Sequence, residues 1–306
     1  HGSGGRLTKD LIEKVFLKYL NCEELRPLED ASYINLNNQK TAITTDSYVV
    51  RPLFFPGGDI GKLSVCGTVN DLIVSGAVPR YLSIGFIIEE GFQIKSLEDI
   101  LKSIKETSKD SGVRIVTGDT KVVEKNKCDG VYINTTGVGE IVKPMFLNDV
   151  SDGDMIIATG TMGDHGIAVA LAREEFNIDA PVESDCAALN DLLMPLLEIK
   201  GIKWMRDPTR GGLATVLAEV SENTKLGVEI LEDSVPVRED VRFISDMLGY
   251  DPLYLANEGK AVIIASGESA DEVIMTLRKH PLGKNAAVIG RISSKFKGAR
   301  LKTGIG

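Results

Sequence analysis

The apolar positions in the first half of the chain switch between a helical spacing and a strand-like spacing. Leu7, Leu11 and Val15 recur about once per helical turn and predict an amphipathic helix over 6–20. Further helices are predicted over 60–75 and 96–111, the latter capped by Ser96, and strands over 41–45, 81–88, 113–117 and 131–138.

A polar run over 148–154, which follows Pro144, predicts a junction between two halves of the chain. Beyond it the pattern predicts strands over 155–159, 228–231, 261–265 and 287–292, and helices over 167–175, 185–198, 212–223, 238–248 and 270–280. Because helices and strands alternate in both halves, we expect an α/β or α+β fold with two domains, 1–150 and 151–306.

Composition and charge narrow the classes of function. Of the 306 residues, 43% are hydrophobic and 26% are charged, which is ordinary for a globular protein and argues against a disordered chain. No apolar run approaches the roughly 20 residues of a membrane span, so we expect no membrane segment, and we expect no signal peptide. The net charge of −9 disfavours binding to nucleic-acid phosphates.

The four cysteines (Cys22, Cys66, Cys128 and Cys186) are far apart and form no CxxC pair. A zinc site or a redox motif is therefore not expected. We expect reduced, mostly buried thiols in a cytoplasmic protein. Because GxSxG and HExxH motifs are absent and the chain has three histidines, nucleophilic hydrolase chemistry is disfavoured.

Four aspartates stand beside glycine, threonine or proline at the ends of predicted elements or in an otherwise apolar helix: Asp46, Asp71, Asp119 and Asp207. Hard cations such as Mg²⁺ take carboxylate oxygens, and phosphoryl transfer needs such ions to bridge phosphate oxygens. Each aspartate alone is weak evidence for a metal site, because aspartate is common in loops and at helix N-termini. As a group they suggest a magnesium site that holds ATP.

Two segments in the first half could bind a nucleotide. Gly2, Ser3, Gly4 and Gly5 leave backbone N–H groups free for a phosphate, although a flexible terminus would look the same. The loop over 51–62 offers Phe54 as an apolar wall for a base, with Asp59 and Lys62 near the phosphates. The alternative is a packed loop or dimer contact in which Asp59 caps the following helix.

Two segments in the second half carry weaker signals. Residues 160–166 form a glycine-containing connection from a strand to a helix, which resembles a phosphate loop but matches no standard pattern. A tight structural connection is the alternative. Glu258, just before a predicted buried strand, could act as a base or a metal ligand, or it could belong to an ordinary turn.

Ten motifs, in this order along the chain, resemble the HypE family of hydrogenase maturation factors: HGSGG, TTDSYV, PLFFPGGDIGKL, GTVNDL, GFIIEEGF, VRIVTGDTKVVE, INTTGVG, GDHGIAV, RDPTRGGLA and NEGK. That family is related to aminoimidazole ribonucleotide synthetase, selenophosphate synthetase and thiamine-monophosphate kinase. The resemblance implies two α/β domains. It also implies a homodimer in which the N-terminal, ATP-binding domains pair into a β-barrel, with ATP near the interface.

The resemblance also implies a reaction, namely ATP-dependent dehydration of a carboxamide on a cysteine thiol to a thiocyanate, which supplies cyanide to the iron of NiFe hydrogenase. HypF would provide the carbamoyl group, and the HypC–HypD complex would receive the product. In this reaction Lys121 would reach the reacting phosphoryl or amide group, and Glu258 would act as the base. Asn70 and Thr120 would join the ATP-binding residues.

One departure from the family concerns the tail. The family's chains end in Pro-Arg-Ile-Cys, whereas this sequence ends in Thr303-Gly304-Ile305-Gly306. We therefore expect the cysteine that carries the carbamoyl group to be absent from these 306 residues. Two alternatives stay open, a selenophosphate synthetase-like enzyme and a nucleotide-binding scaffold without chemistry. A scaffold would have no need of both Lys121 and Glu258.

Overall fold

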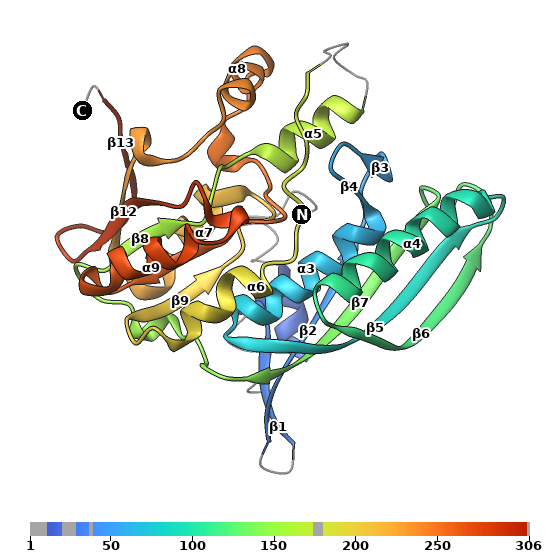
Figure 1. The fold of residues 1–306 in the computed structure, drawn as a ribbon, viewed down its shortest axis with the longest axis horizontal. Helices are drawn as coiled ribbons and strands as arrows, with labels where there is room; N and C mark the ends of the chain where they lie inside the picture. The colour runs from blue at the N-terminus through green and yellow to red at the C-terminus, as the bar shows by residue number, and fades with distance from the viewer. Residues whose placement is uncertain (1–10, 20–28, 37–38, 174–179, 305–306) are drawn as a thin grey trace.

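The computed structural model describes residues 11–19, 29–36, 39–173 and 180–304. Two β-sheets, one from each half of the chain, lie beside each other with helices around and between them (Figure 1). The site described below forms where the two halves meet.

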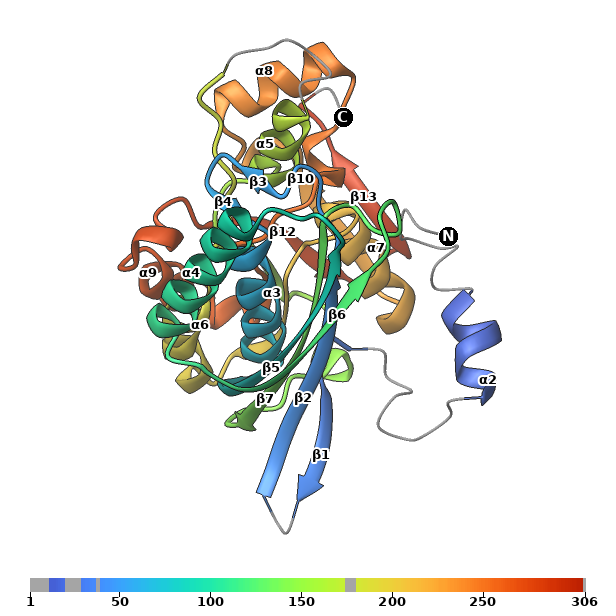
Figure 2. The ribbon, with the colours of Figure 1, turned by 90° about the vertical axis from the view of Figure 1, so that its right-hand side faces the viewer.

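The first sheet has the strand order β1-β2-β7-β5-β6. Its strands are β1 (Ser32–Leu36), β2 (Gln39–Tyr48), β7 (Val131–Ile141), β5 (Ala77–Glu89) and β6 (Arg114–Val123). Only β5 and β6 are parallel among these pairs, and α4 (Ile94–Asp110) provides the crossover that a parallel pair requires. Figure 2 shows the helices α3 (Ile60–Val74) and α4 on one face of this sheet. Thr45, Ser47 and Asn134 are exposed on the other face.

Helix α3 lies between the two halves of the chain and is buried along most of its length. Asp59 caps its N-terminus, because Asp59 Oδ1 accepts hydrogen bonds from the backbone N–H groups of Gly61 (2.6 Å) and Lys62 (3.2 Å). Val65 of this helix belongs to the core of the first sheet, whereas Ile73 belongs to the core of the second. A side chain on α3 can therefore reach residues of either half.

The second sheet has the order β13-β10-β12-β8-β11-β9. Its strands are β13 (Gly298–Lys302), β10 (Gly227–Leu231), β12 (Ala287–Ser293), β8 (Met155–Ala158), β11 (Val262–Ala265) and β9 (Ile202–Arg206). The α-helices of this half are α5 (Asp164–Ala172), α6 (Asn190–Leu193), α7 (Gly212–Thr224), α8 (Glu239–Leu248) and α9 (Ala270–Leu277). Strand β11, between β8 and β9, is fully buried, as expected for the apolar run that follows the Glu258 turn.

Short elements complete the fold. A π-helix, Ile12–Phe16, continues into α2 (Leu17–Tyr19), and β3 (Phe54–Phe55) pairs with β4 (Gly58–Asp59). Short 3₁₀ turns are Leu147–Asp149, Met194–Glu198, Glu232–Ser234, Pro252–Tyr254, Gly267–Ser269 and Pro281–Gly283. Within the described part of the chain, no helix is both long enough and apolar enough to cross a membrane.

Most predicted elements are present, with ends that shift by a few residues, and the exceptions have local causes. Ser96 is not an N-cap, because α4 begins two residues earlier with Gln93 at that position. The helix predicted over 185–198 is wrong in its first part, because residues 185–189 form no helix and α6 begins only at Asn190. Side chains of this part of the chain form hydrogen bonds with other segments. The strands β1, β3, β4, β9 and β13 were not predicted.

Candidate active site

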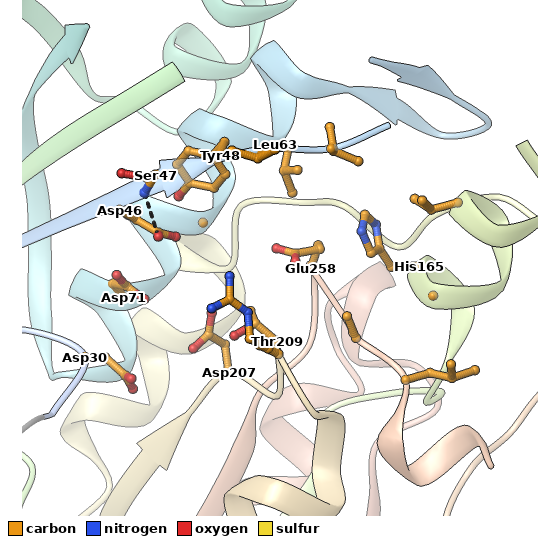
Figure 3. A pocket seen from close by; sticks show the side chains of 18 of the residues that line it. Asp30, Asp46, Ser47, Tyr48, Leu63, Asp71, His165, Asp207, Thr209 and Glu258 are labelled. Carbon is orange, nitrogen blue, oxygen red and sulfur yellow. Dashed lines mark hydrogen bonds between the residues drawn. The ribbon is translucent and has the colours of Figure 1, made fainter. Parts of the chain in front are cut away.

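A cavity of about 660 Å³ is lined by residues from both halves of the chain (Figure 3). The first half contributes residues of β2 and α3, and the second half contributes residues of α5, the 207–210 segment and the turn that ends at Glu258. Four aspartates lie on one side of the cavity, His165 lies on the other, and Glu258 lies between them (Figure 3).

Three of the aspartates form a compact cluster. Asp30, Asp71 and Asp207 each offer a carboxylate oxygen, and these oxygens lie within 4.8 Å of one another. Asp30 precedes β1, Asp71 projects from α3, and Asp207 directly follows β9. The cluster thus joins three segments that are far apart in the sequence. Such a set of carboxylates suits a hard divalent cation.

The electrostatics of this cluster favour a cation. Burial, followed by the charge of Asp30, raises the pKa of Asp207 to about 8. Burial and the charge of Asp207 raise the pKa of Asp71 well above its ordinary value. The nearest compensating charge is Arg206, whose Nε lies 3.0 Å from Asp30 Oδ1 and whose Nη1 lies 2.9 Å from Glu219 Oε2. Since Arg206 is shared with Glu219, a bound Mg²⁺ would supply charge that the protein does not.

Asp46 lies beside this cluster on β2. Its Oδ1 accepts a hydrogen bond from the backbone N–H of Ser47 at 2.7 Å, and burial raises its pKa. The charge of Arg210 acts in the opposite direction and lowers that pKa. Arg210 and Arg173 also line the cavity, so it offers cationic side chains as well as carboxylates, as a polyphosphate would require.

Glu258 sits in a turn whose backbone is bonded on several sides. Its carbonyl oxygen accepts from the amide of Asn70 (3.3 Å) and the backbone N–H of Ala187 (3.3 Å). The preceding residue, Asn257, accepts a hydrogen bond from Gly163 N–H and donates to Pro208 O. Burial and then the charges of nearby carboxylates, first that of Asp207, raise the pKa of Glu258 well above its ordinary value. Such a carboxylate is a stronger base than an exposed one.

Asp185 stabilises the turn that carries Glu258. Its carboxylate accepts hydrogen bonds from the backbone N–H groups of Glu258 (3.1 Å) and Gly259 (3.3 Å) and from Lys260 Nζ (3.1 Å). The side chains of Lys260 and Asp185 are 8% and 2% exposed, so this ion pair is buried. Asp185 therefore fixes the position of the turn that carries Glu258.

Asp119 and Lys121 lie on β6, away from this cavity. Residues paired across a sheet share a face, and the pairs Asp119–Gly85, Gly85–Asn134 and Asn134–Ser47 place Asp119 on the face of Ser47. Asp46 precedes Ser47 and so points to the opposite face. Lys121, two residues after Asp119, shares the face of Asp119. Within one chain the structure does not bring Asp119 or Lys121 to the other predicted metal ligands.

The remaining predicted ATP-binding residues lie at several places. Phe54 is 44% exposed on β3, and Thr120 is exposed on β6. Asp59 is the N-cap of α3, which was the structural alternative, and Lys62 Nζ donates to Gly57 O at 2.9 Å. Asn70 is 1% exposed, and its amide group bonds to backbone atoms of Ala187, Leu189 and Glu258.

The glycine-rich N-terminal segment (Gly2, Ser3, Gly4 and Gly5) and Cys22 lie outside the described residues. The other three cysteines are free and buried, as predicted. The connection over 160–166 is a tight strand-to-helix link in which Gly163, with φ +91°, precedes α5. Whether any of the predicted nucleotide-binding residues contacts ATP stays a prediction.

Two residues of the site, Asp30 and Asp185, were not predicted from the sequence. Asp30 lies two residues before β1 (Ser32–Leu36), a strand that was not predicted, whereas Asp46 was noticed because it ends a predicted strand. Asp185 lies in a segment that was predicted to be helical. In both cases the local signal is weak, because aspartate is common in loops, and only the tertiary contacts identify these two residues.

Similarity to known proteins agrees with this architecture. The profile described as AIR synthase related protein, N-terminal domain, matches residues 28–141, and that of the C-terminal domain matches 151–301. Carbamoyl dehydratase HypE of Escherichia coli is 43% identical over an alignment that covers 98% of this chain and 91% of that protein. The chain belongs to the HypE family.

Solved structures of HypE proteins resemble the whole chain. The chain in the crystal structure of a HypE–HypF complex has a TM-score of 0.92 and 45% identity, and the match covers 97% of both chains. HypE in complex with ATP has a TM-score of 0.85 and 45% identity, with 99% of this chain and 93% of that chain covered. The predicted membership of the HypE family and the two-domain fold of AIR synthase related proteins are thus confirmed.

Proposed function

We propose that this chain is an ATP-dependent carbamoyl dehydratase that converts a carboxamide on a cysteine thiol into a thiocyanate for NiFe hydrogenase maturation. The observation that carries this proposal is one cavity lined both by the cluster of Asp30, Asp71 and Asp207 and by Glu258. Its HypE relatives bear the name carbamoyl dehydratase, and a relative was crystallised with ATP.

The chemistry needs two different groups, and the cavity offers both. An amide oxygen is a poor leaving group until the γ-phosphoryl of ATP is transferred to it with release of ADP. Asp30, Asp71 and Asp207 would hold Mg²⁺, which offsets charge on the phosphates. The carbon–oxygen bond then breaks, phosphate leaves, and the nitrogen loses its protons as the nitrile forms. Glu258, with its raised pKa, is placed to accept a proton in this step.

A homodimer is part of this proposal. Strand β6 is an edge strand of its sheet, and its Val116 and Val122 are 59% and 62% exposed. Exposed apolar edge strands are commonly covered by another chain. We propose that a second copy covers this edge, so that Asp119, Thr120 and Lys121 of one copy meet the ATP bound by the other. Mixing an Asp71→Asn variant with a Lys121→Ala variant should then restore partial activity, which neither variant has alone.

The partners follow from the same reading. A HypE relative is found in a complex with HypF, and we propose a HypF carbamoyltransferase as the source of the carbamoyl group. We further propose delivery of the product to a HypC–HypD complex in the cytoplasm, where the buried thiols stay reduced.

The dehydratase function can be tested with a Pro-Arg-Ile-Cys peptide, S-carbamoylated on its thiol, as the substrate. With the chain and Mg-ATP, we expect ADP release and a peptide that has lost the mass of one water. The uncarbamoylated peptide is the control and should give neither result. If Mg-ATP binds but the carbamoylated peptide keeps its mass, the chain is a nucleotide-binding scaffold and the dehydratase proposal is wrong.

A further inference from the structure

His165 forms part of the cavity wall on the side of Glu258 (Figure 3). It is the second residue of α5 and is 6% exposed. Its Nδ1 lies 2.8 Å from Ser184 Oγ, and the Phe55 ring packs edge-on against the imidazole with centroids 5.4 Å apart and planes at 90°. These two contacts hold the ring in one orientation.

The hydrogen bonds around Ser184 assign the tautomer of His165. Ser184 Oγ already accepts a hydrogen bond from the backbone N–H of Cys186 at 3.1 Å. Among the described residues the Ser184 hydroxyl has no acceptor other than His165 Nδ1, and we infer that its proton points to that nitrogen. A neutral imidazole that accepts at Nδ1 carries its own proton on Nε2. Burial lowers the pKa of His165, in agreement with a neutral ring.

The second ring nitrogen is free to serve a ligand. Within the described part of the chain, His165 Nε2 has no hydrogen-bond partner, and the residue lines the cavity. Because Glu258 lies between His165 and the aspartates in Figure 3, this part of the cavity offers both an N–H donor and a carboxylate acceptor. A primary carboxamide has the matching pair, because its oxygen accepts and its NH₂ group donates.

We propose that His165 is a further substrate-contacting residue, whose Nε2–H donates to the carboxamide oxygen while Glu258 accepts from the carboxamide nitrogen. This inference rests on the proposed dehydratase function and adds the group that recognises the oxygen. The neutral donor fixes the plane of the amide before phosphoryl transfer. When the carbon–oxygen bond breaks, the same donor stabilises the negative charge that develops on the departing oxygen.

The tautomer and the contact are tested first, because neither measurement requires turnover. Nitrogen-15 NMR of the histidine-labelled chain at pH 7 should show His165 as the Nε2–H tautomer. The S-carbamoylated Pro-Arg-Ile-Cys peptide should shift the His165 Nε2 signal, whereas His280, which caps the turn Pro281–Gly283, should not move. An Nδ1–H tautomer, or an unmoved His165 signal at a peptide concentration that saturates binding, would overturn the inference.

Kinetics give the second test. Replacing His165 by Ala should lower peptide-dependent ADP release about 100-fold, the usual cost of losing one such donor, and should leave Mg-ATP affinity unchanged. His165→Gln keeps an N–H donor and should recover most of the rate, and His280→Asn is the matched control. A His165→Ala variant that folds and turns over like the unchanged chain would refute the role. Failure of the unchanged chain to form thiocyanate would instead refute the proposed function, and the NMR result would still decide the inference.

Discussion

Replacing Asp185 by Ala should destabilise the second half of the chain strongly, although Asp185 is not among the residues proposed to bind ATP, Mg²⁺ or the carboxamide. The substitution leaves Lys260 Nζ, on a side chain that is 8% exposed, without its carboxylate at 3.1 Å. Breaking a buried ion pair by removing one partner costs about 3–5 kcal/mol. The backbone N–H groups of Glu258 and Gly259 lose their acceptor as well, so the cost should lie toward the upper end.

The assay is urea unfolding followed by circular dichroism, with and without Mg-ATP. The matched control is Glu140→Ala, which breaks the exposed pair of Arg80 and Glu140, whose side chains are 53% and 64% exposed. An exposed pair contributes less than about 1 kcal/mol, so this variant should unfold almost like the unchanged chain. The thermal midpoint of Asp185→Ala should fall by about 10 °C, whereas that of Glu140→Ala should hardly move.

A double variant separates the lost charge pair from general damage. Asp185→Ala with Lys260→Met removes the orphaned ammonium and should recover part of the lost stability. The reasoning would be refuted if Asp185→Ala cost no more than Glu140→Ala, or if the double variant were less stable than Asp185→Ala alone.

Three further predictions follow from the site. With Mg²⁺ chelated, stability should fall as pH rises from about 5 to 8, because Asp207, with a folded pKa of about 8, holds a proton that the unfolded chain has lost; this one group contributes up to about 1.4 kcal/mol per pH unit. Urea unfolding across that range should show the fall, and saturating Mg²⁺ should reduce it by replacing the proton; a pH-independent stability in the chelator would contradict the buried acidic cluster. Glu258→Gln should keep Mg-ATP affinity in calorimetry while lowering thiocyanate formation at least about 100-fold, and an active variant would remove Glu258 as the base. Gly259→Ala should fail to fold normally, because its Cβ would lie 1.8 Å from Asp185 O, whereas Gly267→Ala, with Gly153 O at 3.5 Å as its nearest contact, should be tolerated; equal thermal midpoints would contradict this packing.

The pattern of apolar and polar positions and the order of the motifs along the chain established the family and the broad architecture. Helical spacing predicted α4, which buries one face and exposes the other, while α3 and several strands, such as β11, were recognised as apolar runs that are buried on all sides. The ten motifs identified the HypE family, since their order along the chain is far more specific than any one of them.

Which carboxylates share a site was decided only by the tertiary structure. Asp30, Asp71 and Asp207 come from three segments, and they meet because α3 lies between the two halves of the chain. Asp119 was grouped with Asp46 because both were expected beside threonine at the ends of predicted strands, but both lie within strands, and a strand turns successive side chains to opposite faces. An extra residue in β6, where Leu82 pairs with Ile115 and Ser83 with Thr117, sets the face on which Asp119 and Lys121 lie. Strand order and register are long-range properties, so local spacing alone could not reveal that separation.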